Sequence, residues 1–413
     1  MKSQKNFKNQ QIANDFFASL QNPSFIENIQ INPKDLLSKA YHFIMLAERN
    51  LHNQKHNDQS NGYYKRDIGT PYGKIDLDVP RSRSSNNKFR PLILPDSYQR
   101  NQKQVNEILM ALLASNYSPN QIKAYLQELG IPYSIDDLKK IADNLISDFN
   151  TWNERPLNNA YQAIFIDAYN AETLINNKVQ NLVIFTVIGI DFDAKKDIIA
   201  TFFMQGNENK EFWLQVFNKL IARGLQKPLY IVTDDFAGLK DAVNTLFPLS
   251  LHQLCIVHLK RNILKNMAKN DATKLNQTIL SIQNQDLNFE QSINLFLSKI
   301  NEFKPKYPTF IEYLNTRINN YFAFTKLPKP VRKYFYTSNC VESFNSILEK
   351  MRRKSGNFFQ NENTLKLNIY INYKKINENW INGLPLLKGY CYELSQLFAS
   401  IFKHQPNNFT QLL

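Results

Sequence analysis

The stretch AIFIDA at residues 163–168 decides how the middle of this chain is expected to fold. It is a short apolar run that ends in a carboxylate, Asp167, and such a run is typical of a buried β-strand. Two further β-rich runs follow it, LVIFTVIGIDF at residues 182–192 and IIATFFMQG at residues 198–206. A polar turn at residues 193–197 separates these two runs, which predicts that they pair as a hairpin.

A fourth strand is expected further along the chain, and it also ends in carboxylates. The run LYIV at residues 229–232 leads into Thr233-Asp234-Asp235, and a helical stripe precedes it at residues 208–223. One short helix is expected at residues 239–246 and another from residue 254 to about residue 267. The order strand, strand, strand, helix, strand, helix predicts an α/β fold and favours a ribonuclease H-like core.

Helical patterns dominate the chain after this core. The first part of the core is assigned to residues 160–265, and residues 266–335, which lack strand signals, are interpreted as a helical insertion. Residues 336–413 are interpreted as the second part of the core, with a helix at residues 339–355 and further C-terminal helices. The expected core is therefore split by the insertion.

The N-terminal third is expected to be a mainly helical DNA-binding region. Residues 1–60 read as helical or flexible, residues 61–99 as a small basic β-rich segment, and residues 100–150 as two helices joined by a turn. Ser118-Pro119-Asn120-Gln121 is a favourable helix start. The order helix, turn, helix is typical of a helix-turn-helix-like DNA-binding domain, but it is equally typical of any helical hairpin. The second helix opens with Asp136-Asp137, which is unfavourable for contact with phosphates.

The composition bounds the class of protein. The 413 residues are enough for two to four domains, and 50 basic against 36 acidic residues give a net charge of +14. This charge suits a polyanionic partner such as nucleic acid, although a compositional bias toward Asn, Lys, Ile, Phe and Tyr would also raise the lysine content. Three widely spaced cysteines predict a reducing compartment rather than a disulfide framework. A polar N-terminus and the lack of a long apolar run predict a cytoplasmic protein without a membrane span.

Asp167 and Asp234 are candidate metal ligands because each ends an apolar run. Two neighbouring strands would bring both carboxylates to one edge of the sheet, where their mutual repulsion favours a divalent cation. Oxygen ligands with open positions suit Mg²⁺, with Mn²⁺ as a substitute. The alternative is that each aspartate only caps the turn or helix that follows it.

Glu342 also has two interpretations. The string Asn339-Cys340-Val341-Glu342 fits a capping box, in which the glutamate serves the N-terminus of its own helix. Asn345, Ser346, Glu349 and Arg353 share its helical face, and such a polar stripe is either a solvated face or a metal ligand with DNA-facing neighbours.

The Cys-x-x-His pair, Cys255 and His258, could be half of a zinc site. A second half with matching spacing is not evident among the other cysteines and histidines. The favoured interpretation is a structural or DNA-proximal element on a helix, with Lys260 and Arg261 next to it as candidate phosphate contacts.

Five strings in this chain resemble the blocks of the Mutator-type transposases of bacterial insertion sequences, and they occur in the order expected of that family. The resemblance as a whole runs from about residue 40 to residue 360. The blocks are NGYYKR…TPYGKIDLDVPRSR…FRP (61–91), IDA (166–168), VTDDFAGLKDAV (232–243), CIVHLKRNI (255–263) and YTSNCVESFNSILEKMRR (336–353).

The resemblance implies a catalytic triad that binds the metal ions. Its members would be Asp167, Asp234 and Glu342, with Asp235 at a variable position. The resemblance also implies Mg²⁺-dependent two-metal chemistry in which a phosphodiester is hydrolysed to free a 3′-hydroxyl, which then attacks a second phosphodiester. The residues expected to contact DNA are Lys260, Arg261, Asn345, Arg352 and Arg353.

The implied partners are double-stranded DNA, as terminal inverted repeats and target, and a second copy of the chain in a homodimer or larger assembly on DNA. The implied location is the bacterial cytoplasm, associated with the nucleoid. Two alternatives stay open: a catalytically inactive, transposase-derived DNA-binding repressor, and a two-metal nuclease that cuts without joining.

The chain departs from the family pattern in the insertion. Residues 260–335 contain no tryptophan, where the family usually has tryptophans. Aromatic residues that could stack on DNA instead are Tyr313, Tyr321, Phe322 and Phe324.

Overall fold

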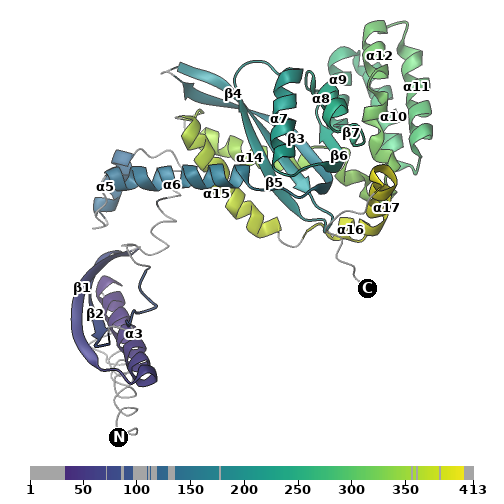
Figure 1. Ribbon diagram of the computed structural model, residues 1–413. Helices are drawn as coiled ribbons and strands as arrows, with labels where there is room; N and C mark the ends of the chain where they lie inside the picture. The colour runs from purple at the N-terminus through teal and green to yellow at the C-terminus, as the bar shows by residue number, and fades with distance from the viewer. Residues whose placement is uncertain are drawn as a thin grey trace, which may run out of the picture. The chain divides into compact units, whose positions relative to one another are not determined.

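The computed structural model describes residues 33–70, 72–84, 88–95, 109, 112, 119–128, 135–175, 178–354, 357–359, 361–380 and 383–403. The chain divides into two compact units, Met1–Asp143 and Asn144–Leu413 (Figure 1). Each unit has its own hydrophobic core, so each is considered by itself.

The first unit contains a β-hairpin packed on a helix. Strands β1 (Ser60–Thr70) and β2 (Gly73–Ser82) pair antiparallel, and helix α3 (Pro33–His56) packs against β2. Apolar residues alternate with polar ones along β2, so its apolar side chains all point toward α3. The small core that results contains Tyr41, Met45, Ile68, Ile75, Leu77, Val79 and Leu94.

Two helices follow in the region interpreted as helix-turn-helix-like. Helix α5 spans Pro119–Glu128 and helix α6 spans Ile135–Glu154, while Ser118 and the connecting residues 129–134 lie outside the described residues. The C-terminal end of α6 belongs to the second unit, where Phe149 and Trp152 are buried in the core. DNA binding by this pair of helices stays a prediction.

The second unit is built around a five-stranded mixed sheet, so the α/β class is confirmed. Its order is β5-β4-β3-β6-β7, with β3, β4 and β5 antiparallel and β6 and β7 parallel to β3. The strands are β3 (Ala160–Ile175), β4 (Lys178–Ile190), β5 (Lys196–Met204), β6 (Lys227–Thr233) and β7 (Leu251–Leu254).

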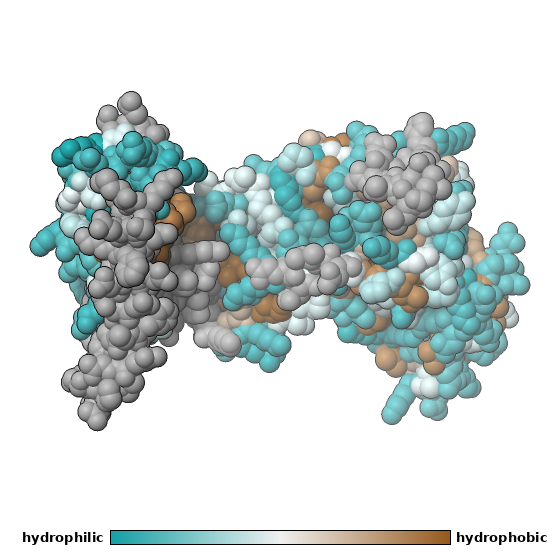
Figure 2. All heavy atoms as spheres, turned by 90° about the horizontal axis from the view of Figure 1, so that it is seen from below, coloured by the Kyte–Doolittle hydropathy of each residue, from teal (hydrophilic) through white to brown (hydrophobic). Residues whose placement is uncertain are grey.

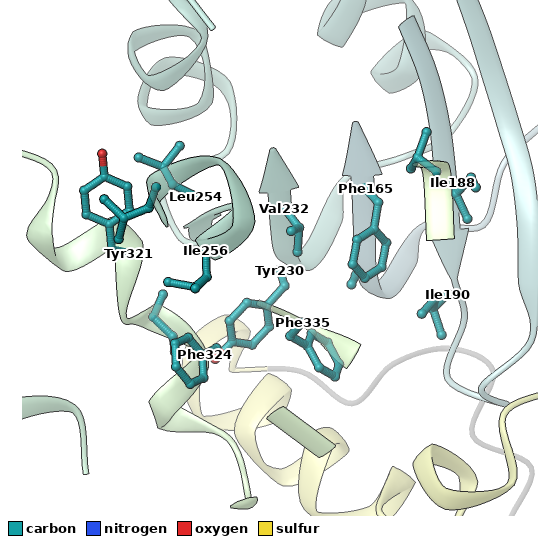
Figure 3. Packing of buried hydrophobic residues seen from close by; sticks show 14 of the residues in the cluster. Phe165, Ile188, Ile190, Tyr230, Val232, Leu254, Ile256, Tyr321, Phe324 and Phe335 are labelled. Carbon is teal, nitrogen blue, oxygen red and sulfur yellow. Dashed lines mark hydrogen bonds between the residues drawn. The ribbon is translucent and has the colours of Figure 1, made fainter. Parts of the chain in front are cut away.

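Helices cover both faces of this sheet (Figure 1). Ile164, Ile166 and Ile231 point to one face and join a cluster with helices α7 (Lys210–Ala222) and α8 (Leu239–Leu246). Phe165, Tyr230 and Val232 point to the opposite face, because successive side chains of a strand alternate. Figure 3 shows Tyr230 on that face between Phe324 and Phe335.

Most remaining elements of the second unit contribute to the core on the side of Phe165 and Tyr230, some against the sheet itself and others mainly through neighbouring helices. They are α9 (Ile256–Asn266), α10 (Lys269–Asn284), α11 (Phe289–Phe303), α12 (Pro308–Asn315), α13 (Ile318–Tyr321), η1 (Ala323–Lys326), η2 (Lys329–Tyr334), α14 (Asn339–Lys354), α15 (Glu362–Trp380), α16 (Pro385–Lys388) and α17 (Cys391–Phe402).

Strand β7 was not expected from the sequence. It has only four residues, and its two central side chains, His252 and Gln253, are polar but buried. His252 Nε2 lies 2.9 Å from Thr233 Oγ1, and the Gln253 amide donates to the carbonyl oxygen of Tyr321 at 2.8 Å. Because these hydrogen bonds are made inside the protein, two polar side chains can be buried here, and their polarity conceals the strand from a hydrophobicity pattern.

The surface of the second unit turned to the viewer in Figure 2 mixes hydrophilic side chains with small hydrophobic patches. No helix in the described part of the chain has both the length and the apolar character needed to cross a membrane.

Candidate active site

Asp167 and Asp234 lie next to each other across two parallel strands. The last paired positions of β3 and β6 are Ile166 and Thr233, and each aspartate is the next residue along its strand direction. Asp167 does not end its strand, as the apolar run suggested, because β3 continues to Ile175 paired with β4 alone. What ends beside Asp167 is the pairing between β3 and β6, whose last pair is Ile166 and Thr233, so Asp167 has no strand partner on that side.

Asp167 is buried among other carboxylates. Its side chain lies on the α14 face of β3, and the residue is only 6% exposed. Burial, followed by the negative charge of Asp234 and then that of Glu342, raises the pKa of Asp167 to about 7. The charges of both groups therefore act on the Asp167 carboxyl.

Two hydrogen bonds hold the Asp167 side chain. Its Oδ1 accepts the backbone N–H of Ala168 at 2.9 Å, and its Oδ2 accepts the Asn345 amide at 3.2 Å. Asn345 is one helical turn beyond Glu342 and is 8% exposed. Its Oδ1 is buried and has no hydrogen-bond partner among the described residues. Asn345 therefore faces the carboxylates, and its predicted contact with DNA stays a prediction.

Glu342 is positioned by the start of helix α14. The backbone N–H groups of Val341 and Glu342 donate to the Ser338 carbonyl oxygen at 2.8 and 3.0 Å, so the helix is capped at Ser338. Glu342 is then the fourth helical residue, whereas a capping box needs the glutamate at the third. The interpretation of Asn339 to Glu342 as a capping box is therefore wrong.

Helix α9 links Asp234 to Glu342. His258 Nδ1 lies 2.6 Å from Asp234 Oδ1, and Arg261 Nη1 lies 3.2 Å from His258 Nε2 and 4.0 Å from Glu342 Oε1. The Asp234 carboxylate, followed by Cys255, raises the pKa of His258 to about 10. These contacts connect two of the triad carboxylates through side chains of one helix.

Cys255 joins His258 and Asp234 in a group that could hold a metal ion. One potential ligand atom from each residue lies within 4.8 Å of the other two. Cys255 is buried at the N-terminal boundary of α9, and His258 follows one turn later. The spacing of the Cys-x-x-His pair does not reveal Asp234, because this residue follows strand β6 and comes before the whole of helix α8.

Asp235 fastens the helical insertion beside the site. Arg317 Nε lies 2.5 Å from Asp235 Oδ2, and the Tyr313 hydroxyl donates to the same oxygen. The Arg317 guanidinium also lies over the Tyr313 ring, 4.0 Å from its centroid. Sequence reasoning missed this contact because about 80 residues separate the partners and no local pattern links them.

Two of the candidate DNA-contacting cations have largely exposed side chains, although one of them, Arg353, also pairs with Glu349 at 2.8 Å. The side chains of Arg261 and Arg353 are 62% and 71% exposed. Lys260 donates to Gln283 Oε1 at 2.7 Å, and the 20% exposed Arg352 side chain binds Glu349. DNA contact by these residues stays a prediction, and the exposed pair is the better placed for it.

The aromatic residues of the insertion are mostly core residues. Tyr321, Phe322 and Phe324 are at most 2% exposed, so they cannot stack on DNA in this arrangement. Tyr313 is partly exposed, and its ring stacks on Phe310.

Comparison with known proteins assigns the chain to a family. The family described as "Transposase, Mutator family" matches residues 2–383. This chain belongs to the Mutator family of transposases. The matched residues of this Mutator-family transposase include every strand of the mixed sheet and the whole of α14.

Insertion-sequence transposases are among the relatives of this Mutator-family protein. It is 27% identical to the transposase for insertion sequence element ISRM3 of Rhizobium meliloti (strain 1021), over 78% of the chain and 80% of the relative. It is 27% identical to the transposase for insertion sequence element IS905 of Lactococcus lactis, over 74% and 76%. Identity to the transposase for IS256 in transposon Tn4001 of Staphylococcus aureus is 25%, over 84% and 90%.

Proposed function

We propose that this protein is a metal-dependent DNA transposase that cleaves DNA at the terminal inverted repeats of its insertion sequence and joins the freed 3′-ends to target DNA. The observation that carries the proposal is the convergence of Asp167, Asp234 and Glu342 at the point where β6 ends. The names of the relatives support the substrate and the reaction class.

The sheet supports a ribonuclease H-like fold for the catalytic unit. Three antiparallel strands are followed by two strands parallel to the first, and the first strand is central in the order β5-β4-β3-β6-β7. The split of the core by helices α10–α13 accounts for the long interval between Asp234 and Glu342.

The three carboxylates fit Mg²⁺, with Mn²⁺ as a substitute. Burial and the negative charge of Asp234 raise the pKa of Asp167, a cost that a bound divalent cation would offset, while Asp234 Oδ1 forms an ion pair with His258 Nδ1. Hard oxygen donors with open positions are what Mg²⁺ prefers. When bound, such ions would supply activation of the attacking oxygen and stabilisation of the leaving oxygen in phosphodiester chemistry.

Neighbouring side chains position the triad and the DNA. The Asn345 amide donates a hydrogen bond to one oxygen of Asp167. This bond would hold the carboxylate in its orientation before DNA binds. Arg261 approaches Glu342 and is exposed enough to contact a phosphate as well. Arg353 lies about three turns along α14 from Glu342, and its exposed guanidinium would offer DNA a second positive charge besides Arg261.

The proposed partners are double-stranded DNA and at least one further copy of the chain. A net charge of +14 favours a polyanion, and two DNA ends must be held together for joining. The first unit, with its basic hairpin, would position the DNA ends.

A strand-transfer assay with pre-cut, labelled element ends tests the proposal. We expect the wild-type protein to join these ends to target DNA when Mg²⁺ is present. Cleavage without joining would point to a nuclease, and Mg²⁺-independent binding without any cleavage would point to a DNA-binding repressor.

A further inference from the structure

Asp234, Cys255 and His258 bring an oxygen, a sulfur and a nitrogen donor to one side of the candidate active site. Asp234 directly follows strand β6, and the other two residues open helix α9, so rigid elements position all three. A backbone hydrogen bond from Cys255 N–H to the Thr233 carbonyl oxygen, 2.8 Å long, fixes the start of α9 beside the end of β6. The donor set therefore depends on the fold of the sheet and not on a mobile loop.

Two of these donor atoms face each other directly. Asp234 Oδ1 and His258 Nδ1 are buried and form an ion pair 2.6 Å long. Zinc bonds to nitrogen and oxygen of about 2.0–2.1 Å, at tetrahedral angles, place two ligand atoms about 3.3 Å apart. A shift of less than about 1 Å would thus let both atoms share one ion.

The chemistry of the set differs from that of the carboxylate triad. A cysteine thiolate and an imidazole select zinc-like ions, whereas Mg²⁺ prefers oxygen donors. Ser338 Oγ lies 3.6 Å from Cys255 Sγ and can donate to the sulfur, as outer-shell partners of metal ligands do. A cavity of about 290 Å³ lies against the three residues, and it leaves room for a fourth, exchangeable ligand such as water.

We propose that Asp234, Cys255 and His258 form a site for a thiophilic divalent cation of the zinc class. Binding would release the thiol proton of Cys255 and the imidazolium proton of His258 to solvent. Because Asp234 is shared, occupation of this site would withdraw it from the triad and inhibit DNA cleavage. This regulatory consequence rests on the proposed function, whereas the binding itself does not.

Cobalt binding tests the site directly, because Co²⁺ bound to a thiolate in tetrahedral geometry has a sulfur-to-cobalt absorption band. We expect the full-length, metal-free protein to show this band, and one equivalent of Zn²⁺ to bleach it. Cys255→Ser abolishes the band, while Cys340→Ser and Cys391→Ser retain it and serve as matched controls. Circular dichroism and Tm show that each variant is folded.

Two further variants separate this site from the triad. Asp234→Asn weakens Co²⁺ binding, whereas Asp167→Asn leaves the cobalt band in place. No band in the wild-type protein, or the same band in Cys255→Ser, would overturn the proposal.

Zinc inhibition supplies the second readout. With Mg²⁺ present, we expect micromolar Zn²⁺ to reduce the rate of DNA cleavage by the wild-type protein at least tenfold. In Cys255→Ser, the cleavage rates with and without Zn²⁺ should be nearly equal. Cobalt binding without any cleavage under Mg²⁺ would contradict the proposed function and leave the metal site standing. Cleavage under Mg²⁺ without a cobalt band would contradict the metal site and leave the proposed function standing.

Discussion

Asp167 and Asp234 each lie one residue beyond the last paired positions of two parallel strands, Ile166 and Thr233. Parallel pairing gives both strands the same direction, so the two carboxylates emerge at one edge and on the face that α14 covers. Glu342 lies on that helix, and its charge contributes to the raised pKa of Asp167, although 175 residues separate the two in sequence.

Asn345 is expected to act as a positioning residue for Asp167. Asn345→Ala removes the 3.2 Å hydrogen bond to Asp167 Oδ2, and a hydrogen bond to a charged group contributes about 1.5–3 kcal/mol. We predict a decrease in cleavage rate on the order of tenfold to a hundredfold and a higher Mg²⁺ concentration for half-maximal activity. Ser346→Ala, which alters an exposed neighbour, is the control, and equal rates for both variants would contradict the assignment.

The stability of the metal-free protein is expected to depend on the charge of Asp167. Its pKa is raised to about 7, first by burial and then by Asp234, whereas an aspartate in an unfolded chain titrates near pH 4. Between these values the folded state binds more protons than the unfolded state, so the free energy of unfolding falls as pH rises. In EDTA, the wild-type Tm should therefore fall between about pH 4 and pH 7 by more than that of Asp167→Asn.

Mg²⁺ provides the check on this pH effect. At pH 8 we expect Mg²⁺ to raise the Tm of the wild-type protein by several degrees and that of Asp167→Asn by much less. Asp241→Asn, an exposed aspartate on α8, should behave like the wild type. Parallel pH curves for wild type and Asp167→Asn would refute the account of this carboxylate.

Gly238 is expected to be indispensable to the loop that carries Asp234. Its φ is +74°, and a Cβ there would lie 2.3 Å from the backbone nitrogen of Lys210. Gly206 also has a positive φ, +97°, but a Cβ there would meet nothing within 4 Å. Gly238→Ala should therefore destabilise the protein by on the order of 3 kcal/mol, and Gly206→Ala by about 1 kcal/mol. Chemical denaturation measures both, and a larger effect at Gly206 would be the contrary result.

The contact between Asp235 and Arg317 is expected to couple the insertion to the site. A double-mutant cycle with Asp235→Ala and Arg317→Ala should give a coupling energy of at least about 0.5 kcal/mol in stability. The surface pair Lys299 and Glu302 is the matched control, since exposed ion pairs contribute little. Additive effects for Asp235 and Arg317 would show that this ion pair does not couple the insertion to the site.

The sequence was informative where structure is local. Apolar runs marked β3 to β6, and the ends of two of these runs identified the carboxylates that the register brings together. Helical periodicity placed Asn345 on the face of Glu342, although it did not show that the amide faces Asp167.

Contacts between distant segments could not be read from the sequence in the same way. Strand β7 has no hydrophobic signature because two of its buried side chains are polar and form hydrogen bonds with residues elsewhere in the chain. The approach of Asp234 to Cys255 and His258, and of Asp235 to Arg317, depends on how α9 and the insertion pack against the sheet. The spacing of residues within one segment does not predict the distance between side chains of two different segments.

Cleavage of labelled element-end DNA in Mg²⁺ tests the central claim most directly, with wild type compared with Asp234→Ala, Glu342→Gln and the control Asp241→Asn. We predict that the wild type and the control cut and join the DNA, whereas both triad variants bind it and lose activity by at least a thousandfold, as expected when a group that holds the metal ions is removed. Cleavage by either triad variant at close to the wild-type rate would contradict the assignment of the active site.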